Sequence, residues 1–213
     1  MNIPLPKQYS YKDIAKVEND ILHIYVPIKF EDLMYDLTYA VKDSNKCYYC
    51  SRPLSRDRST LDHLYPRDLG GPTIPNNLCI SCANCNSNKS NMFEKEFLIY
   101  STLSDIDKKA FYHDYGSYLH FLKKWYSPVL PDGWVSYERI GKIIMSDLPY
   151  PLVKGKTYNK VKKLYKKYGR LYRAIIVDKK YKLLDGFNTL IFSQDNSIPL
   201  IPTIVLENVE LDY

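Results

Sequence analysis

The chain has 213 residues, five cysteines and a formal net charge of +6 at pH 7. This length accommodates one medium-sized domain or two small ones with a substantial core. No apolar run approaches the roughly 20 residues that a membrane-spanning helix needs, and no basic start followed by an apolar stretch marks a signal peptide. We therefore expect a cytoplasmic (intracellular) protein without membrane contact.

The first 46 residues are expected to brace the segment that follows them. Pro4 and Pro6 favour an extended start. Residues 21–26 are rich in β-forming side chains and predict a strand, whereas the apolar positions of residues 30–41 have helical spacing. We interpret residues 1–46 as a strand and a helix that pack against the next domain.

Two Cys-x2-Cys pairs, Cys47/Cys50 and Cys82/Cys85, enclose the most informative part of the chain. Four thiolates at such spacing can form a closed, tetrahedral zinc site with a structural role. Cys79 also precedes this pair, and we choose Cys82 and Cys85 because Cys85 then opens the polar segment 86–89. Cys79 lies in a short apolar run and is expected to be a buried thiol. Disulfides or inert thiols are the alternative, but nothing marks the chain as secreted, and a reducing compartment favours metal binding.

Between the cysteine pairs the pattern predicts a strand, a loop, a return strand and a helix. Residues 60–64 alternate like a half-buried strand, and Pro66 with the Gly-Gly pair after it indicates a loop. Residues 78–81 are compatible with the return strand and residues 84–90 with a short helix. Asp62 and His63 are then expected on opposite faces of the first strand.

The side chains of this insert fit hydrolytic chemistry. Asp62 and Asn86 supply a carboxylate and a carboxamide oxygen, which suit a hard divalent cation whose other ligands are water and phosphate. Such a cation polarises a phosphate oxygen and stabilises the leaving oxygen. His63, next to Asp62 in the sequence, is the candidate to remove a proton from the attacking water molecule.

The pattern Asp-His-x2-Pro, Gly-Gly, Asn-Leu-x3-Cys-x2-Cys-Asn-x2-Lys resembles the HNH endonuclease family and its ββα-metal fold. The resemblance implies a DNA endonuclease in which His63 is the general base and Asp62 and Asn86 bind the catalytic cation, normally Mg²⁺. It implies that Asn77 holds the catalytic loop through backbone hydrogen bonds and that Lys89 supports the helix or contacts phosphate. Asn86 stands where the family name has histidine.

Basic side chains near this motif and further along the chain are candidates for contacts with DNA phosphates. Residues 151–182 carry twelve Lys or Arg and a single acid, Asp178, which suggests a nucleic-acid footprint. The alternative is a solvated loop and a solvated helix face. The candidate contacts are Arg56, Arg58, Arg67, Lys89, Lys160, Lys163 and Lys167.

Two helices are predicted after the second cysteine pair, over residues 92–103 and 105–125, with Ser104 as N-cap of the second. A Pro/Gly-rich break at residues 127–133 is the expected domain boundary. The domains are therefore predicted as 1–46, 47–126 and 127–213. The buried face of the second helix is predicted to comprise Phe111, Tyr115, Tyr118, Leu119, Leu122 and Trp125.

The C-terminal part is expected to be a small α+β domain. The pattern predicts a short helix over residues 136–146, a second break at residues 148–151, a basic helix over 156–168, and strands over 173–177, 181–184 and 201–206. The segments Ile175-Ile176-Val177-Asp178, Leu183-Leu184-Asp185-Gly186 and Ile201-Pro202-Thr203-Ile204-Val205 faintly resemble the ParB/sulfiredoxin superfamily. Because no base follows Lys182, a scaffold or recognition role is expected rather than nucleotide binding.

The sequence thus predicts an α+β protein: a zinc-stapled ββα-metal module with flanking helices, followed by a small α+β domain. The predicted function is hydrolysis of double-stranded DNA with structural Zn²⁺ and catalytic Mg²⁺. The alternative is a zinc-stapled nucleic-acid-binding protein with a silent nuclease site. The presence of Asp62, His63, Asn77 and Asn86 together favours the enzyme.

Overall fold

The computed structural model describes residues 15–18, 21–24, 33, 34, 38, 42, 45–125, 134–145 and 155–211. The chain forms two compact units: Met34–Leu130, and Met1–Leu33 together with Pro131–Tyr213. The predicted extended start, most of the predicted helix at 30–41 and the breaks at 127–133 and 148–151 lie outside the described residues. Every helix in the described part of the chain is too short or too polar to cross a bilayer.

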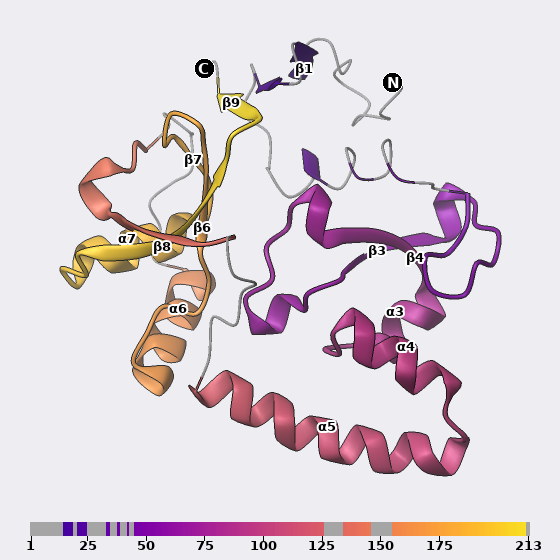
Figure 1. Cartoon of the computed structure of the whole chain (residues 1–213). Helices are drawn as coiled ribbons and strands as arrows, with labels where there is room; N and C mark the ends of the chain where they lie inside the picture. The colour runs from indigo at the N-terminus through magenta and orange to yellow at the C-terminus, as the bar shows by residue number, and fades with distance from the viewer. Residues whose placement is uncertain are drawn as a thin grey trace. The chain divides into compact units, whose positions relative to one another are not determined.

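In its described part, the unit Met34–Leu130 is built on a hairpin and three helices (Figure 1). Strands β3 (Ser59–His63) and β4 (Leu78–Cys82) pair antiparallel, and α3 (Ala83–Lys89) follows directly. Short 3₁₀ turns occupy Arg56–Arg58, Arg67–Leu69 and Pro75–Asn77. The strand–loop–strand–helix order is the one predicted from the sequence.

Two longer helices, α4 (Glu94–Thr102) and α5 (Asp105–Trp125), complete this unit. Ser104 caps α5 as predicted, because its Oγ accepts the Asp107 backbone N–H at 3.2 Å. Tyr115 and Leu122 are buried, but Tyr118 is 47% exposed, so its predicted place in the core is wrong. The apolar core contains Cys47, Cys82, Cys85, Met92, Phe97 and Tyr115.

The described residues of the other unit form two sheets. The larger sheet has the strand order β5-β8-β6-β7, with α6 (Lys156–Tyr168) and α7 (Phe187–Asp195) packed on each other beside it. Its strands are β5 (Ser136–Arg139), β6 (Ile175–Asp178), β7 (Leu183–Asp185) and β8 (Leu200–Leu206). The smaller sheet has the order β1-β2-β9, from Ala15–Glu18, Ile21–Ile24 and Val209–Leu211.

The helix predicted over residues 136–146 is wrong. This segment forms β5 and a 3₁₀ turn, Ile140–Lys142. The physical reason is pairing with a distant part of the chain: β5 runs antiparallel to β8, from Ser136 opposite Thr203 to Arg139 opposite Leu200. A strand that completes the edge of a sheet satisfies its backbone groups there, and this gain outweighs local helical preference.

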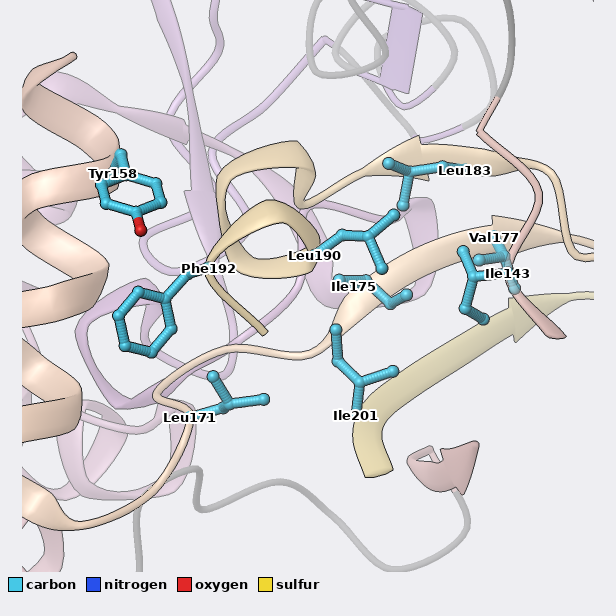
Figure 2. Close-up of a cluster of buried hydrophobic side chains, with 9 residues drawn as sticks. All are labelled: Ile143, Tyr158, Leu171, Ile175, Val177, Leu183, Leu190, Phe192 and Ile201. Carbon is cyan, nitrogen blue, oxygen red and sulfur yellow. The ribbon is translucent and has the colours of Figure 1, made fainter. Parts of the chain in front are cut away.

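The core of this unit lies between the sheet and its two helices. Figure 2 shows the ring of Tyr158 from α6 near Phe192 from α7, while aliphatic side chains of the strands, of α7 and of the connecting segments fill the rest. Gly186, with φ +97°, starts α7 where an added Cβ would lie 2.9 Å from the Ile175 Cα. The buried cluster comprises Ile143, Tyr158, Leu171, Ile175, Val177, Leu183, Leu190, Phe192 and Ile201.

A charged cluster supports the smaller sheet. Glu210 on β9 is buried and pairs with Lys179 at 2.5 Å and with Lys180. The hydrogen bonds from Lys179 and Lys180 lower the pKa of the Glu210 carboxyl to about 2. The carboxylate is therefore the form that stabilises this part of the fold.

Candidate active site and zinc centre

Four cysteines come together at the base of the β3–β4 hairpin. Cys47 and Cys50 belong to the turn before it, Cys82 ends β4, and Cys85 lies in α3; their sulfur atoms are all within 4.8 Å of one another. A tetrahedral zinc with Zn–S bonds of about 2.3 Å separates its sulfur ligands by about 3.8 Å. Four sulfur atoms within 4.8 Å of one another are close to that spacing, so the cluster fits zinc.

Backbone N–H groups point at these sulfurs, as thiolates require. The Cys82 N–H donates to the Cys47 sulfur at 3.3 Å, and the Cys85 N–H donates to the Cys82 sulfur at 3.4 Å. Burial raises the pKa of Cys47, but hydrogen bonds from the backbone of Cys82, Cys50 and Tyr49 outweigh this effect and lower the pKa to about 7. This thiol therefore reaches the metal-binding form near neutral pH.

Cys79 lies outside the cluster. It is 2% exposed on β4, and burial raises the pKa of its thiol to about 12. It is a neutral thiol at physiological pH, and the structure places it as the sequence predicted, in the core rather than among the four clustered sulfurs.

The Asp62 carboxylate is held from two directions. Tyr49 donates its hydroxyl hydrogen to Asp62 Oδ2 at 2.7 Å. The ammonium of Lys89 lies 3.1 Å from Oδ2 and 3.3 Å from Oδ1. Because Asp62 is only 6% exposed, these partners fix its orientation rather than leaving it to solvent.

Lys89 is buried, whereas its predicted contact with DNA phosphate requires a position at the surface. The lysine is 0% exposed, and besides pairing with Asp62 its ammonium donates to the His63 carbonyl at 2.7 Å. A phosphate contact requires an ammonium that reaches the surface, whereas this one is enclosed between β3 and α3. In this position the Lys89 ammonium joins α3 to β3 and is not accessible to a phosphate.

Asn86 and Asp62 face the same side of the hairpin. The Asn86 side-chain amide donates to Thr60 Oγ1 at 3.1 Å and to the Leu61 carbonyl at 3.3 Å. Thr60 and Asp62 are two residues apart on β3 and share a face, just as Asn86 and Lys89 share a face of α3. The Asp62 carboxylate and the Asn86 carboxamide therefore both project into the interface between β3 and α3.

This donor set fits a hard divalent cation. A carboxylate and a carboxamide oxygen are ligands that Mg²⁺ accepts, with water and substrate phosphate completing its shell. In the described part of the chain no group donates a hydrogen bond to Asn86 Oδ1. Its lone pairs are thus open to a cation, whereas Asp62 is shared with the Lys89 ammonium.

His63 lies on the opposite face of β3 from Asp62, as the strand alternation predicts. Its imidazole is 8% exposed, and Nε2 lies 3.0 Å from Thr73 Oγ1 in the loop between the strands. Thr73 is itself 5% exposed, so this hydrogen bond is formed in a buried position and fixes the plane of the ring.

Asn77 ties together the two ends of this loop. Its Oδ1 accepts the Tyr65 N–H at 2.8 Å, and its Nδ2 donates to the carbonyls of Pro72 at 2.8 Å and Tyr65 at 3.1 Å. These are hydrogen bonds of the kind that the family resemblance implies for a central asparagine. Gly71 is also needed here, because an added Cβ would lie 2.1 Å from the Tyr65 carbonyl oxygen.

The remaining basic candidates lie on the surface. Arg56, Arg58 and Arg67 are exposed around the hairpin. Lys160, Lys163 and Lys167 are exposed on α6, in the other compact unit. The structure thus places these six side chains where solvent and phosphate can reach them.

Sequence reasoning missed two residues that contact the candidate catalytic groups, Tyr49 and Thr73. Tyr49 lies between two cysteines of the cluster, and the Cys-x2-Cys spacing does not indicate what its side chain contacts. Thr73 lies in a loop between a Gly-Gly-Pro turn and β4, and nothing in its neighbours indicates that it contacts His63. Only the folded loop brings these groups together.

The comparisons with known proteins agree with this geometry. Residues 47–99 match the HNH endonuclease family. We call this segment the HNH module. The match confirms the resemblance predicted from the sequence, and with the four-cysteine cluster it confirms an α+β chain that contains a ββα module with a zinc-type clamp. It concerns a nuclease-type, nucleic-acid-associated family.

The comparison with solved structures gives a much weaker similarity. A solved structure entitled "Structure of the C2221 form of Pnob8-like ParB-N domain" is 16% identical, with a TM-score of 0.28, and the match covers 33% of this chain and 28% of that one. The match thus spans less than a third of that protein, and a similarity of this size assigns neither a fold nor a role to this chain. A comparison with curated proteins gives no match.

Proposed function

We propose that the protein is a metal-dependent endonuclease that hydrolyses phosphodiester bonds of double-stranded DNA. The observation that carries the proposal is the common orientation of Asp62 and Asn86, which both project between β3 and α3 inside a segment that matches HNH endonucleases. A catalytic divalent cation needs oxygen ligands held in place by a rigid element, and the hairpin presents two such residues on one side.

Each side chain has a defined task in this proposal. Asp62 and Asn86 hold the divalent cation, which when bound supplies the positive charge that stabilises the phosphate and the leaving oxygen. His63, fixed by Thr73, accepts the proton of the attacking water. Asn77 keeps the loop between β3 and β4 in the conformation that this arrangement requires. The products are expected to carry 5′-phosphate and 3′-hydroxyl ends, as the family resemblance implies.

The decisive experiment is cleavage of supercoiled plasmid by the zinc-loaded protein in Mg²⁺. EDTA should abolish cleavage, and His63→Ala should lower the rate by ~10²–10⁴-fold if His63 removes the proton. His120→Ala is the matched control. Because His120 is exposed on α5, this variant should cleave like the wild type. Wild-type cleavage by His63→Ala, with zinc retained, would remove this histidine from the mechanism.

The basic helix α6 is the proposed site of contact with the DNA backbone. Its six lysines include three i,i+4 pairs, and within the described residues none has an acidic partner. Other lysines of the same unit are paired, such as Lys142 with Glu138 at 3.0 Å. Like charges at this spacing destabilise a helix, and a polyanion removes that repulsion. The six lysines are Lys156, Lys160, Lys162, Lys163, Lys166 and Lys167.

Binding of duplex DNA by His63→Ala protein in EDTA tests this surface without cleavage. Neutralising Lys160, Lys163 and Lys167 with glutamine should reduce the slope of log K against log salt by about 0.9 for each lost phosphate contact. Lys142→Gln is the control, because it removes an exposed but paired lysine. Equal slopes for both variants would exclude α6 from the interface.

A second function is supported by one observation. The Lys89 ammonium already neutralises Asp62, so it competes with a divalent cation for the same oxygens. A zinc-stapled nucleic-acid-binding protein with a silent nuclease site would have such a pairing. Tight, salt-sensitive DNA binding without cleavage in Mg²⁺, Mn²⁺ or Ni²⁺ would favour this alternative.

A further inference from the structure

Tyr49 links the two candidate metal-binding groups of the HNH module. It lies in the turn between Cys47 and Cys50, two residues of the four-cysteine cluster. Its hydroxyl, at the other end of the side chain, donates to Asp62 Oδ2 at 2.7 Å. A single side chain therefore joins the four-cysteine cluster to the carboxylate of the proposed cation site.

The direction of the Tyr49 hydroxyl is determined by its surroundings. Cys79 donates its thiol hydrogen to the hydroxyl oxygen at 3.5 Å, so the hydroxyl accepts from one side and donates to Asp62 on the other. The ring packs edge-on against Phe97, with centroids 4.9 Å apart, and against Tyr48, with centroids 5.2 Å apart. These contacts keep the ring from turning the hydroxyl away from the carboxylate.

This arrangement distinguishes the two oxygens of Asp62. Oδ2 is engaged by the Tyr49 hydroxyl at 2.7 Å and by Lys89 at 3.1 Å. In the described part of the chain Oδ1 has a single hydrogen-bond partner, Lys89, at 3.3 Å. Oδ1 is therefore the oxygen that is better able to accept a cation, and the Tyr49 hydrogen bond is what keeps the two oxygens in these separate roles.

We propose that Tyr49 is a positioning residue that orients Asp62 for the divalent cation and makes the cation affinity depend on the four-cysteine clamp. The inference rests on the proposed nuclease function and adds a residue that neither the motif nor the family match specifies. Groups that orient a metal ligand commonly contribute 10–100-fold to metal affinity or activity. Loss of the hydroxyl would leave Asp62 with more electron density to donate to the cation, which by itself would tighten binding. Weaker cation binding by the variant therefore identifies the loss of orientation.

The test compares Tyr49→Phe with Tyr48→Phe, which removes a hydroxyl from the same turn. The Tyr48 hydroxyl donates to Glu94 and does not contact Asp62, so this variant is a matched control. Mn²⁺ affinity is measured without DNA by electron paramagnetic resonance on zinc-loaded protein, and zinc content is measured in parallel. Tyr49→Phe should bind Mn²⁺ about 10-fold more weakly, whereas Tyr48→Phe should match the wild type with one zinc per chain in each.

Cleavage gives a second readout. For Tyr49→Phe the Mg²⁺ concentration at half-maximal rate should rise by a similar factor, while KM for DNA should stay unchanged. Replacement of Tyr49 by 4-aminophenylalanine keeps a hydrogen-bond donor at the same place and should restore most of the affinity. Failure of this rescue would overturn the inference.

The remaining outcomes separate this inference from the function on which it rests. Equal or tighter Mn²⁺ binding by Tyr49→Phe, with wild-type cleavage intact, would overturn the role of Tyr49 alone. Loss of zinc by Tyr49→Phe would overturn it as well, because the tyrosine would then serve the clamp and not the cation site. A wild-type protein that neither binds Mn²⁺ nor cleaves DNA would overturn the proposed function and the inference together.

Discussion

Replacement of Lys89 by methionine tests the centre of the HNH module. The change keeps the length of the side chain but removes an ammonium that is 0% exposed, lies 3.1 Å from Asp62 Oδ2 and donates to the His63 carbonyl at 2.7 Å. Asp62 is left as a buried carboxylate with the Tyr49 hydroxyl as its remaining donor.

The expected loss is large because the surviving charge is uncompensated. Breaking a buried ion pair by removing one partner costs about 3–5 kcal/mol, and we expect the lower half of this range because Tyr49 still donates to Asp62. For a unit of roughly 100 residues, 1 kcal/mol corresponds to about 4–8 °C in Tm. Lys89→Met should therefore lower the Tm of the unit Met34–Leu130 by more than ~10 °C.

The assay is calorimetric unfolding of zinc-loaded wild type, Lys89→Met and Asp62→Asn/Lys89→Met. The double variant should recover part of the loss, because no charge remains buried. Mg²⁺ should raise the Tm of Lys89→Met more than that of the wild type, since the cation replaces the missing ammonium. A loss below about 1 kcal/mol, or a double variant as unstable as the single one, would refute the buried pair.

Three further predictions concern the loop, the clamp and the charged cluster. Gly71→Ala should destabilise the protein by about 1–3 kcal/mol through its clash with the Tyr65 carbonyl, whereas Gly116→Ala, in open space on α5, should stabilise it by about 0.5–1 kcal/mol; urea unfolding measures both. Cys82→Ser should lose zinc, but Cys79→Ser should retain it, as metal analysis of the purified variants will show. Glu210→Gln should destabilise at pH 7. The pKa of this carboxyl is lowered to about 2 in the folded state, so its contribution to stability is present above the unfolded pKa of about 4.3 and disappears as the pH falls towards 2. The difference in unfolding free energy between the wild type and Glu210→Gln should therefore be smaller at pH 2 than at pH 7. An equal difference at both pH values would contradict this.

Elements with strong local patterns were predicted well. The helices α5 and α6 have the predicted bounds, because their apolar spacing and the Ser104 cap are contained in a few consecutive residues. The cysteine spacing likewise identified the four clustered sulfurs, since metal ligands in closely spaced pairs are a local property of the sequence.

Features that depend on distant contacts were not predictable in this way. Strand β5 exists because β8, more than 60 residues later, supplies its hydrogen-bond partners. Lysine is usually a surface residue, yet the packing of α3 on β3 encloses Lys89 beside Asp62. The contact of Tyr49 with Asp62 likewise requires the folded turn between the cysteines.

The pairing of β2 with β9 has a consequence for the modular build of the chain. These strands lie parallel in one sheet, although the whole unit Met34–Leu130 lies between them in the sequence. The unit Met34–Leu130, which contains the HNH module, is thus an insertion within a host unit whose N- and C-terminal segments associate with each other. A cassette of this kind can be excised and bridged by a short linker without removing a strand from either host sheet.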